Sequence, residues 1–134
     1  MDFDELLAIA KAKATEERRL SRLATAGDVA AAILTDRGSV YTGVCLDVPA
    51  GMGFCAETAA IAAMITAGES RIVKLVAAGF GEEGACTPCG RCRALIDALN
   101  DENYKCEVLL EDGSVTTIEQ LLPYRMNDER YFSI

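Results

Sequence analysis

The spacing of apolar residues in the first part of the chain predicts an amphipathic helix over residues 4–24. Leu6 and Ile9 lie at helical spacing, and the apolar pattern resumes at Leu20, while most charged residues fall on other faces. Lys13 interrupts this apolar stripe. Its aliphatic stem therefore has to cover the edge of the core, or the helix packs only at its two ends.

Short apolar segments that favour strands alternate with helical segments through the rest of the chain. The predicted strands are residues 29–35, 39–45, 71–80 and 104–110, and the predicted helices are 55–67, 88–99 and 118–122. Asp36-Arg37-Gly38 is a turn signal that joins the first two strands in a hairpin. Thr87 is the predicted N-cap of the helix that starts at Pro88. This order predicts one α/β domain over residues 1–134, in which helices cover a mixed or largely parallel sheet in three α/β/α layers.

Composition places the chain among soluble globular proteins with a substantial core. It has 134 residues, of which 51% are hydrophobic and 25% are charged. Its formal net charge of -8 argues against nucleic acid as a partner, because phosphate backbones are bound by basic faces. A free small molecule is therefore the expected substrate.

The sequence contains no segment with the character of a membrane span or of a secretory signal. No apolar stretch approaches the ~20 residues that cross a bilayer, and the amino terminus is acidic where a signal would be basic. The expected location is the cytoplasm, without a membrane partner. The six cysteines are then expected to be reduced thiols that bind metal or pack in the core, more than a disulfide framework.

Three cysteines have the spacing of a metal site, in a chain that contains no histidine. Cys89 and Cys92 are three residues apart, so their thiols share one face at the start of a predicted helix and can hold one ion. Cys55, at the start of another predicted helix, would be the third ligand. Three protein ligands leave the fourth tetrahedral position of zinc for water, which is typical of catalytic zinc sites.

Zinc with three thiolate ligands carries a net negative charge, and it would acidify water less well than a site of neutral imidazoles. Positive groups have to compensate for this charge. Both groups of ligands lie at predicted helix starts, where thiolates are stabilised. Arg91 or Arg93 is close enough in sequence to hydrogen-bond a ligand sulfur as well.

Glu57 follows Cys55 by two residues and is the candidate acid/base group. Because Cys55 lies at the helix boundary, its side chain need not follow helical spacing, so both side chains can face the ion. A carboxylate in this position can take a proton from the attacking water and pass it to a leaving amine. The spacing therefore indicates hydrolytic deamination at zinc.

The motif Cys55-Ala56-Glu57, followed by Pro88-Cys89-Gly90-Arg91-Cys92, resembles the zinc-dependent cytidine deaminase family, in its small cytidine deaminase and blasticidin-S deaminase branch. The likeness extends over residues 28–123. It implies a cytidine deaminase-like fold, zinc bound by the three cysteines, and a proton shuttle at Glu57. It also implies conversion of a cytidine-type ring amine to a carbonyl with release of ammonia, and homotetramers whose sites are completed by neighbouring subunits.

The chain departs from the cytidine deaminase pattern where that family binds the sugar. Cys45 and Asp47 stand where an Asn-x-Glu pair is usual, and Gly27-Asp28 replaces a Phe-Pro pair. Thr58 stands where an arginine often follows the glutamate. The expected substrate-binding residues are Asp28, Cys45, Asp47 and Phe54. We therefore expect the chemistry to be preserved and sugar recognition to be altered, toward a modified nucleoside or an aminated antibiotic of the blasticidin-S type.

The sequence leaves other interpretations open. The cysteines form a structural zinc knot if Cys86 supplies a fourth ligand, or a disulfide redox motif at residues 89–92. A non-catalytic, zinc-stabilised binding or assembly protein would keep the same fold. The biological role, as pyrimidine salvage, detoxification or resistance, is open as well.

Overall fold

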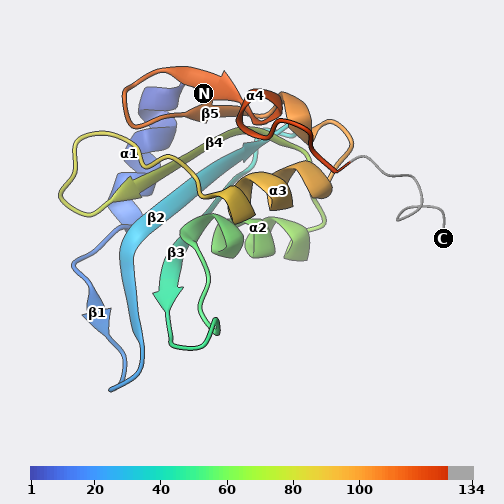
Figure 1. Ribbon diagram of the computed structural model, residues 1–134. Helices are drawn as coiled ribbons and strands as arrows, with labels where there is room; N and C mark the ends of the chain where they lie inside the picture. The colour runs from blue at the N-terminus through green and yellow to red at the C-terminus, as the bar shows by residue number, and fades with distance from the viewer. Residues whose placement is uncertain (127–134) are drawn as a thin grey trace.

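A mixed β-sheet forms the middle layer of the structure, with helices on both of its faces (Figure 1). The structure is a computed structural model, and it describes residues 1–126. Within these residues the strands are β1 (Arg18–Arg19), β2 (Thr25–Thr35), β3 (Val40–Asp47), β4 (Ile72–Gly79), β5 (Glu107–Leu109) and β6 (Val115–Thr117). The helices are α1 (Phe3–Lys13), α2 (Ala56–Thr66), α3 (Gly90–Ala98), the 3₁₀ helix η1 (Asn103–Lys105) and α4 (Ile118–Leu121). In this described part of the chain, no helix combines the length and the apolar character that a membrane crossing needs.

The strand order is β1-β2-β4-β5-β6. Both β1 and β4 pair with one edge of β2, and β3 pairs with the opposite edge. Over residues 1–126, β4 and β5 form the parallel pair and the remaining pairs are antiparallel. The expected mixed sheet is confirmed, but it is mainly antiparallel. The cause is the connectivity. A tight turn with Gly38 at φ +80 makes β2 and β3 a hairpin, and only the link through α3 is a crossover between parallel neighbours.

Residues of the central strands face the two helical layers alternately. Ala31 and Ile33 of β2 belong to one core, together with apolar residues of α2 and α3. Ala32, between them, packs with Leu6 and Ala10 of α1 in a second core. Both faces of β2 are therefore buried, which explains its nearly continuous apolar sequence. The expected α/β/α layers are confirmed, with α1 on one face of the sheet and α2 and α3 on the other (Figure 1).

The helix expected over residues 4–24 is wrong beyond Lys13, where α1 ends. The N–H of Thr15 donates to the carbonyl of Gly27 at 2.8 Å, and β1 then pairs with the start of β2. Leu20, where the apolar pattern resumed, is 57% exposed. Backbone pairing with β2 therefore prevails over the amphipathic pattern, because beyond α1 the helix would have no core to cover.

The strand expected over residues 104–110 is only partly correct, because residues 103–105 form η1 and only β5 is extended. The cause is the fully buried side chain of Asn103. It accepts a hydrogen bond from the N–H of Ile72 and donates one to the carbonyl of Ile96, both at 2.9 Å. The sequence pattern gives no sign of β6, since three residues are too few to establish an alternation.

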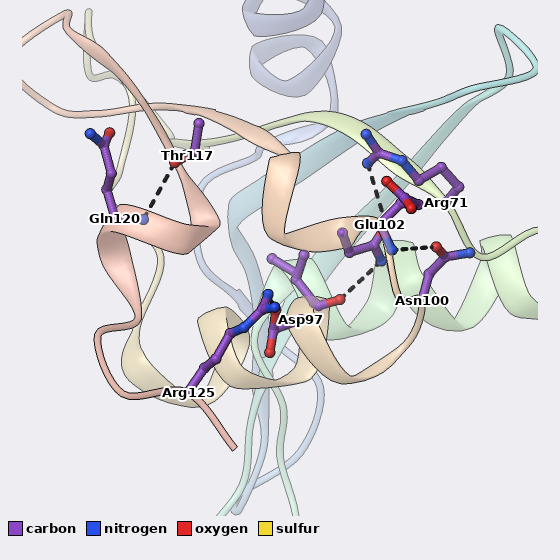
Figure 2. A network of polar contacts seen from close by, with 9 residues as sticks. Arg71, Asp97, Asn100, Glu102, Thr117, Gln120 and Arg125 are labelled. Atoms are coloured by element: carbon purple, nitrogen blue, oxygen red, sulfur yellow. Dashed lines mark hydrogen bonds and ion pairs between the residues drawn. The ribbon is translucent and has the colours of Figure 1, made fainter. Parts of the chain in front are cut away.

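Figure 2 shows the polar contact that caps α4 and the ion pair that ties the segment after α4 to α3. Thr117 caps α4 by accepting a hydrogen bond from the N–H of Gln120 at 3.3 Å. Arg125 Nη1 pairs with Asp97 Oδ1 of α3 at 2.9 Å. The carbonyl end of α4 is therefore held next to the helix that carries two of the candidate metal ligands.

Glu69 is a buried carboxylate at the opposite end of α2 from Cys55. It is 6% exposed, accepts a hydrogen bond from Thr35 Oγ1 at 2.7 Å and accepts another from the Tyr41 hydroxyl. These two bonds hold the pKa of Glu69 below its ordinary value of 4.5, and the bond from Tyr41 has the larger effect. The carboxylate thus ties the end of α2 to the β2–β3 hairpin.

We expect Glu69→Gln to make unfolding less sensitive to acid. Because the pKa of Glu69 is lower in the folded than in the unfolded protein, its contribution to stability is fully present above 4.5 and is lost as the pH falls through the folded value. Urea unfolding at about pH 7 and about pH 3 measures this loss, with Glu16→Gln at an exposed glutamate as the control. Identical pH dependence in the wild-type and Glu69→Gln proteins would contradict the assignment.

Candidate active site

The thiols of Cys55, Cys89 and Cys92 meet at one point, and their sulfurs all lie within 4.8 Å of one another. The Sγ atoms of Cys55 and Cys89 are 3.6 Å apart, and those of Cys89 and Cys92 are 3.5 Å apart. Tetrahedral zinc with bonds of about 2.3 Å needs sulfurs separated by about 3.8 Å. The donor set therefore fits zinc in both its chemistry and its spacing.

Cys55 and Cys89 are the N-cap residues of α2 and α3. Both have extended backbones (φ -74, ψ 159 and φ -69, ψ 167), and neither side chain caps its own helix. The thiols lie at the partially positive starts of two helices. The expected N-cap of α3 at Thr87 is wrong by two residues. The N–H of Cys86 donates to the carbonyl of Ala77 at 2.7 Å, so the chain is still bridged to β4 directly before Thr87, and Cys89 keeps an extended backbone before the helix begins.

Burial and mutual contact control the protonation of this thiol cluster. Burial, followed by the hydrogen bond to Glu57, raises the pKa of Cys92, and burial, followed by the Cys89 thiol, raises the pKa of Cys55. Burial also opposes ionisation of Cys89, but hydrogen bonds from the N–H and the thiol of Cys92 outweigh it and lower the pKa of Cys89. A divalent cation that binds all three sulfurs therefore displaces protons.

Glu57 lies in the first turn of α2 and faces the thiol cluster. Its side chain is 5% exposed, and its Oε2 accepts a hydrogen bond from Cys92 Sγ at 3.0 Å. The position of α2 is fixed by a close contact with β3, where a Cβ on Gly43 would lie 2.4 Å from the backbone nitrogen of Ala60. The structure thus brings together the candidate acid/base group and the three candidate ligands from two separate parts of the sequence.

A cavity of about 680 Å³ opens over this cluster. Its walls include Cys55, Glu57 and Cys89. They also include the four residues expected to bind substrate, which are Asp28, Cys45, Asp47 and Phe54. A cavity of this volume falls in the range of small-molecule sites. Two of the candidate metal ligands, the acid/base group and the expected substrate-binding residues therefore line one pocket, and the third ligand, Cys92, lies buried behind them.

Asp28, Cys45 and Asp47 form a second group on the wall of the cavity, with ligand atoms within 4.8 Å of one another. Cys45 Sγ donates to Asp28 Oδ1 at 3.0 Å and lies 3.9 Å from Asp47 Oδ2. Burial, followed by the bond to Asp28, raises the pKa of Cys45, so this thiol stays protonated. This part of the wall therefore offers carboxylate oxygens as hydrogen-bond acceptors. The thiol of Cys45 already donates its proton to Asp28.

Phe54 reaches the cavity because the loop after β3 folds back on itself. The N–H of Leu46 donates to the carbonyl of Phe54 at 3.0 Å, and the N–H of Phe54 donates to the carbonyl of Leu46 at 2.9 Å. This bridge also brings Leu46 and Val48 to the cavity wall. Sequence analysis missed these two residues, since nothing in an apolar strand end separates a pocket wall from core.

The expected hydrogen bond from an arginine to a ligand sulfur does not occur within residues 1–126. Arg93 Nε donates to the carbonyl of Pro88 at 2.9 Å, and its Nη1 donates to the carbonyl of Leu121 at 3.2 Å. Arg91 is exposed and lines the cavity. Arg93 therefore binds the backbone of the ligand loop and the backbone of α4 rather than sulfur.

Cys86 lines the same cavity but is not one of the thiols that meet within 4.8 Å in the described part of the chain. A structural knot with four sulfurs would need it as a ligand. Cys106 is fully buried in the core and belongs neither to the thiol cluster nor to the cavity wall of the described residues. The geometry thus favours three thiol ligands with one side of the cluster open to the cavity.

Three protein ligands on zinc beside a glutamate that is not a ligand are typical of the zinc-dependent deaminases, which remove ring amines by hydrolysis. The fold and the site described above have this combination. The family model of the cytidine and deoxycytidylate deaminase zinc-binding region matches residues 4–107. The chain belongs to this family, and its cofactor is zinc.

Known cytidine deaminases are similar to this chain in sequence and structure. A curated cytidine deaminase of Mycobacterium tuberculosis is 38% identical over 69 residues, so the match spans about half of either protein, 51% of each. The crystal structure of cytidine deaminase from Mycobacterium leprae has a TM-score of 0.76 and 28% identity, over 92% of this chain and 98% of that one. That of cytidine deaminase from Burkholderia pseudomallei has a TM-score of 0.74 and 28% identity, over 94% and 100%.

Proposed function

We propose that this chain is a zinc-dependent hydrolase that converts the ring amine of a cytidine-type nucleoside, or of an analogue, to a carbonyl and releases ammonia. The observation that carries this proposal is the position of Glu57 Oε2, 3.0 Å from Cys92 Sγ, in a cavity of about 680 Å³ beside the three thiols. The similarity to cytidine deaminases of 28% identity over nearly the whole chain supports it.

Cys55, Cys89 and Cys92 would hold the zinc ion in this proposal. Zinc in such a site acts as a Lewis acid that makes water a nucleophile near neutral pH. Glu57 Oε2 accepts one proton of the attacking water and passes it to the ring nitrogen beside the amine-bearing carbon, as the new C–O bond forms and the C=N π pair moves to that nitrogen. The same oxygen then takes the remaining hydroxyl proton of the adduct and delivers it to the ring amine, so the C–N bond breaks, the carbonyl forms and ammonia leaves.

Asp28, Cys45, Asp47 and Phe54 would contact the rest of the substrate. The two carboxylates accept hydrogen bonds but donate none. In residues 1–126 neither forms an ion pair with a basic side chain. This acceptor-rich wall favours a second candidate, an aminated nucleoside of the blasticidin-S type, because an ammonium or guanidinium group would pair with a carboxylate and offset one of the two negative charges. Phe54, 37% exposed, is available for stacking on a ring.

Ammonia release from a panel of cytidine, deoxycytidine, amino-substituted cytidines, free cytosine and blasticidin S tests the proposal. Zinc-loaded protein should deaminate at least one cytosine nucleoside. The substrate with the highest kcat/KM shows which sugar, or which substituent on it, the site prefers. Turnover of blasticidin S or of amino-cytidines well above cytidine would establish the second candidate. A zinc-loaded, folded protein that releases ammonia from none of them would overturn the proposal in favour of a zinc-stabilised binding protein.

The proposal extends to the assembly and location of the protein. We infer that the chain forms one domain over residues 1–134 in the cytoplasm, and that it associates into homotetramers, as the resemblance implies. Met52, which lies between the cavity-wall residues Gly51 and Gly53, is 63% exposed, and Phe54 is 37% exposed; these large apolar side chains support an assembled state that covers them. Free thiols at all six cysteines agree with a reducing compartment.

A further inference from the structure

Arg93 bridges the loop that carries Cys89 and the carbonyl end of α4. It lies on α3, one residue after Cys92, and its guanidinium donates from Nε to the Pro88 carbonyl and from Nη1 to the Leu121 carbonyl. The Pro88 carbonyl belongs to the peptide bond that enters Cys89. Fixing this planar peptide fixes the position of the Cys89 Cα and the direction of its N–Cα bond, so the rotation about that bond is the backbone freedom left to the Cys89 side chain.

We propose that Arg93 is a positioning residue for the metal site, and that it acts through the Pro88–Cys89 peptide rather than through sulfur. It holds this peptide against α4 and keeps the Cys89 sulfur at the spacing from Cys55 and Cys92 that zinc requires. The inference rests on the proposed function only in taking these three cysteines as the zinc ligands.

Both carbonyls that Arg93 binds need a donor. Pro88 is fully buried, so its carbonyl has little access to water, and a buried acceptor without a partner is costly. Leu121 ends a four-residue helix, whose last carbonyls have no partner within the helix. Arginine suits this place because its planar group carries several N–H donors in a fixed geometry, whereas lysine is a point charge on a flexible stem.

Arg125 and Arg91 separate this role from two simpler ones. Arg125 Nη1 binds Asp97 Oδ1 at 2.9 Å and also clamps the C-terminal segment to α3, but it does not bind the ligand loop. Arg91 carries the same charge as Arg93 on the first turn of α3, but it is exposed, and within residues 1–126 the Pro88 carbonyl is bound by Arg93 instead. Loss of Arg125 therefore tests general weakening of the C-terminal packing, and loss of Arg91 tests loss of positive charge near the thiols.

The experiment measures zinc affinity in the full chain by competition with a chromophoric chelator, together with the absorption spectrum of the cobalt-substituted protein. Arg93→Gln should lower zinc affinity by about 10- to 100-fold, as outer partners of metal ligands do, and should alter the cobalt–thiolate bands. Arg93→Lys should recover part of the affinity. Arg125→Gln and Arg91→Gln should each change the affinity by no more than about threefold, since Arg125 pairs with Asp97 instead of the ligand loop and the exposed charge of Arg91 is screened by salt.

Wild-type zinc affinity and an unchanged cobalt spectrum in folded Arg93→Gln would overturn the proposal. An equal loss in Arg91→Gln would also overturn it, because charge alone would then explain the effect. If Arg93→Gln does not fold, Arg93→Lys decides: weaker zinc binding with an altered cobalt spectrum supports positioning, and wild-type values for both overturn it. The proposed function fails separately, when zinc-loaded wild-type protein releases no ammonia, since these affinities do not depend on turnover.

Discussion

Glu57→Gln should lose deamination by ~100- to 10,000-fold while the protein keeps its zinc. The amide has nearly the shape of the carboxylate, but it does not accept a proton from water or return one to a leaving amine. The three thiols remain in place, since Glu57 is bound to Cys92 as a hydrogen-bond acceptor and is not one of the clustered donor groups. Ammonia release measures the activity, and atomic emission measures the bound zinc.

Glu119→Gln is the matched control, because Glu119 is an exposed glutamate on α4 and should tolerate the same change. Full activity in Glu57→Gln would contradict the role of Glu57 as proton shuttle. Loss of zinc together with activity would contradict the separation of Glu57 from the metal ligands. A variant that keeps zinc, keeps its fold and loses turnover is the outcome that the site geometry predicts.

Cys92→Ala should behave as the metal-free protein. Cys92 is fully buried and its sulfur is 3.5 Å from that of Cys89, so its loss leaves two thiols where zinc needs three protein ligands. A metal that binds only the folded state stabilises it by about 4 kcal/mol at a thousandfold excess over its Kd. Calorimetry with and without a chelator measures this: the Tm of the wild type should fall on zinc removal, and that of Cys92→Ala should not respond.

Cys106→Ala controls for the loss of a buried thiol, because Cys106 is also fully buried but lies in the core outside the cluster. It should lose some packing energy and still respond to the chelator as the wild type does. Stoichiometric, tight zinc in Cys92→Ala would contradict the assignment of Cys92 as a ligand. A wild-type Tm that is indifferent to the chelator would contradict the metal's part in stability.

The sequence predicts the clustering of the candidate site residues better than the end of α1 or the start of β5, because this clustering depends partly on local structure. Cys89 and Cys92 lie within one turn at a helix start, and Glu57 follows Cys55 across a helix boundary. Such short-range geometry follows from spacing alone. The meeting of the two helix starts is a tertiary event, and there the motif resemblance supplied what spacing does not.

Spacing in the sequence does not predict structure that depends on contacts between distant residues. The apolar spacing through Leu20 favours a helix, but pairing of β1 with β2 gives the segment backbone partners that helical periodicity does not reveal. Asn103 replaces the start of an expected strand by a turn, because its side chain bonds to Ile72 and Ile96 from other elements. The sequence predicts a ligand sulfur as the partner of either Arg91 or Arg93, but one of the two carbonyls that Arg93 binds is that of Leu121, 28 residues away. Proximity in sequence does not identify such partners.

X-ray absorption at the zinc edge tests the central claim most directly, because it counts the sulfurs around the metal in the native protein. Three sulfurs at about 2.3 Å and one lighter atom are expected, from Cys55, Cys89, Cys92 and a position open to the cavity. Four sulfurs would mean that Cys86 closes the site, and the protein would then hold zinc for structure rather than for deamination.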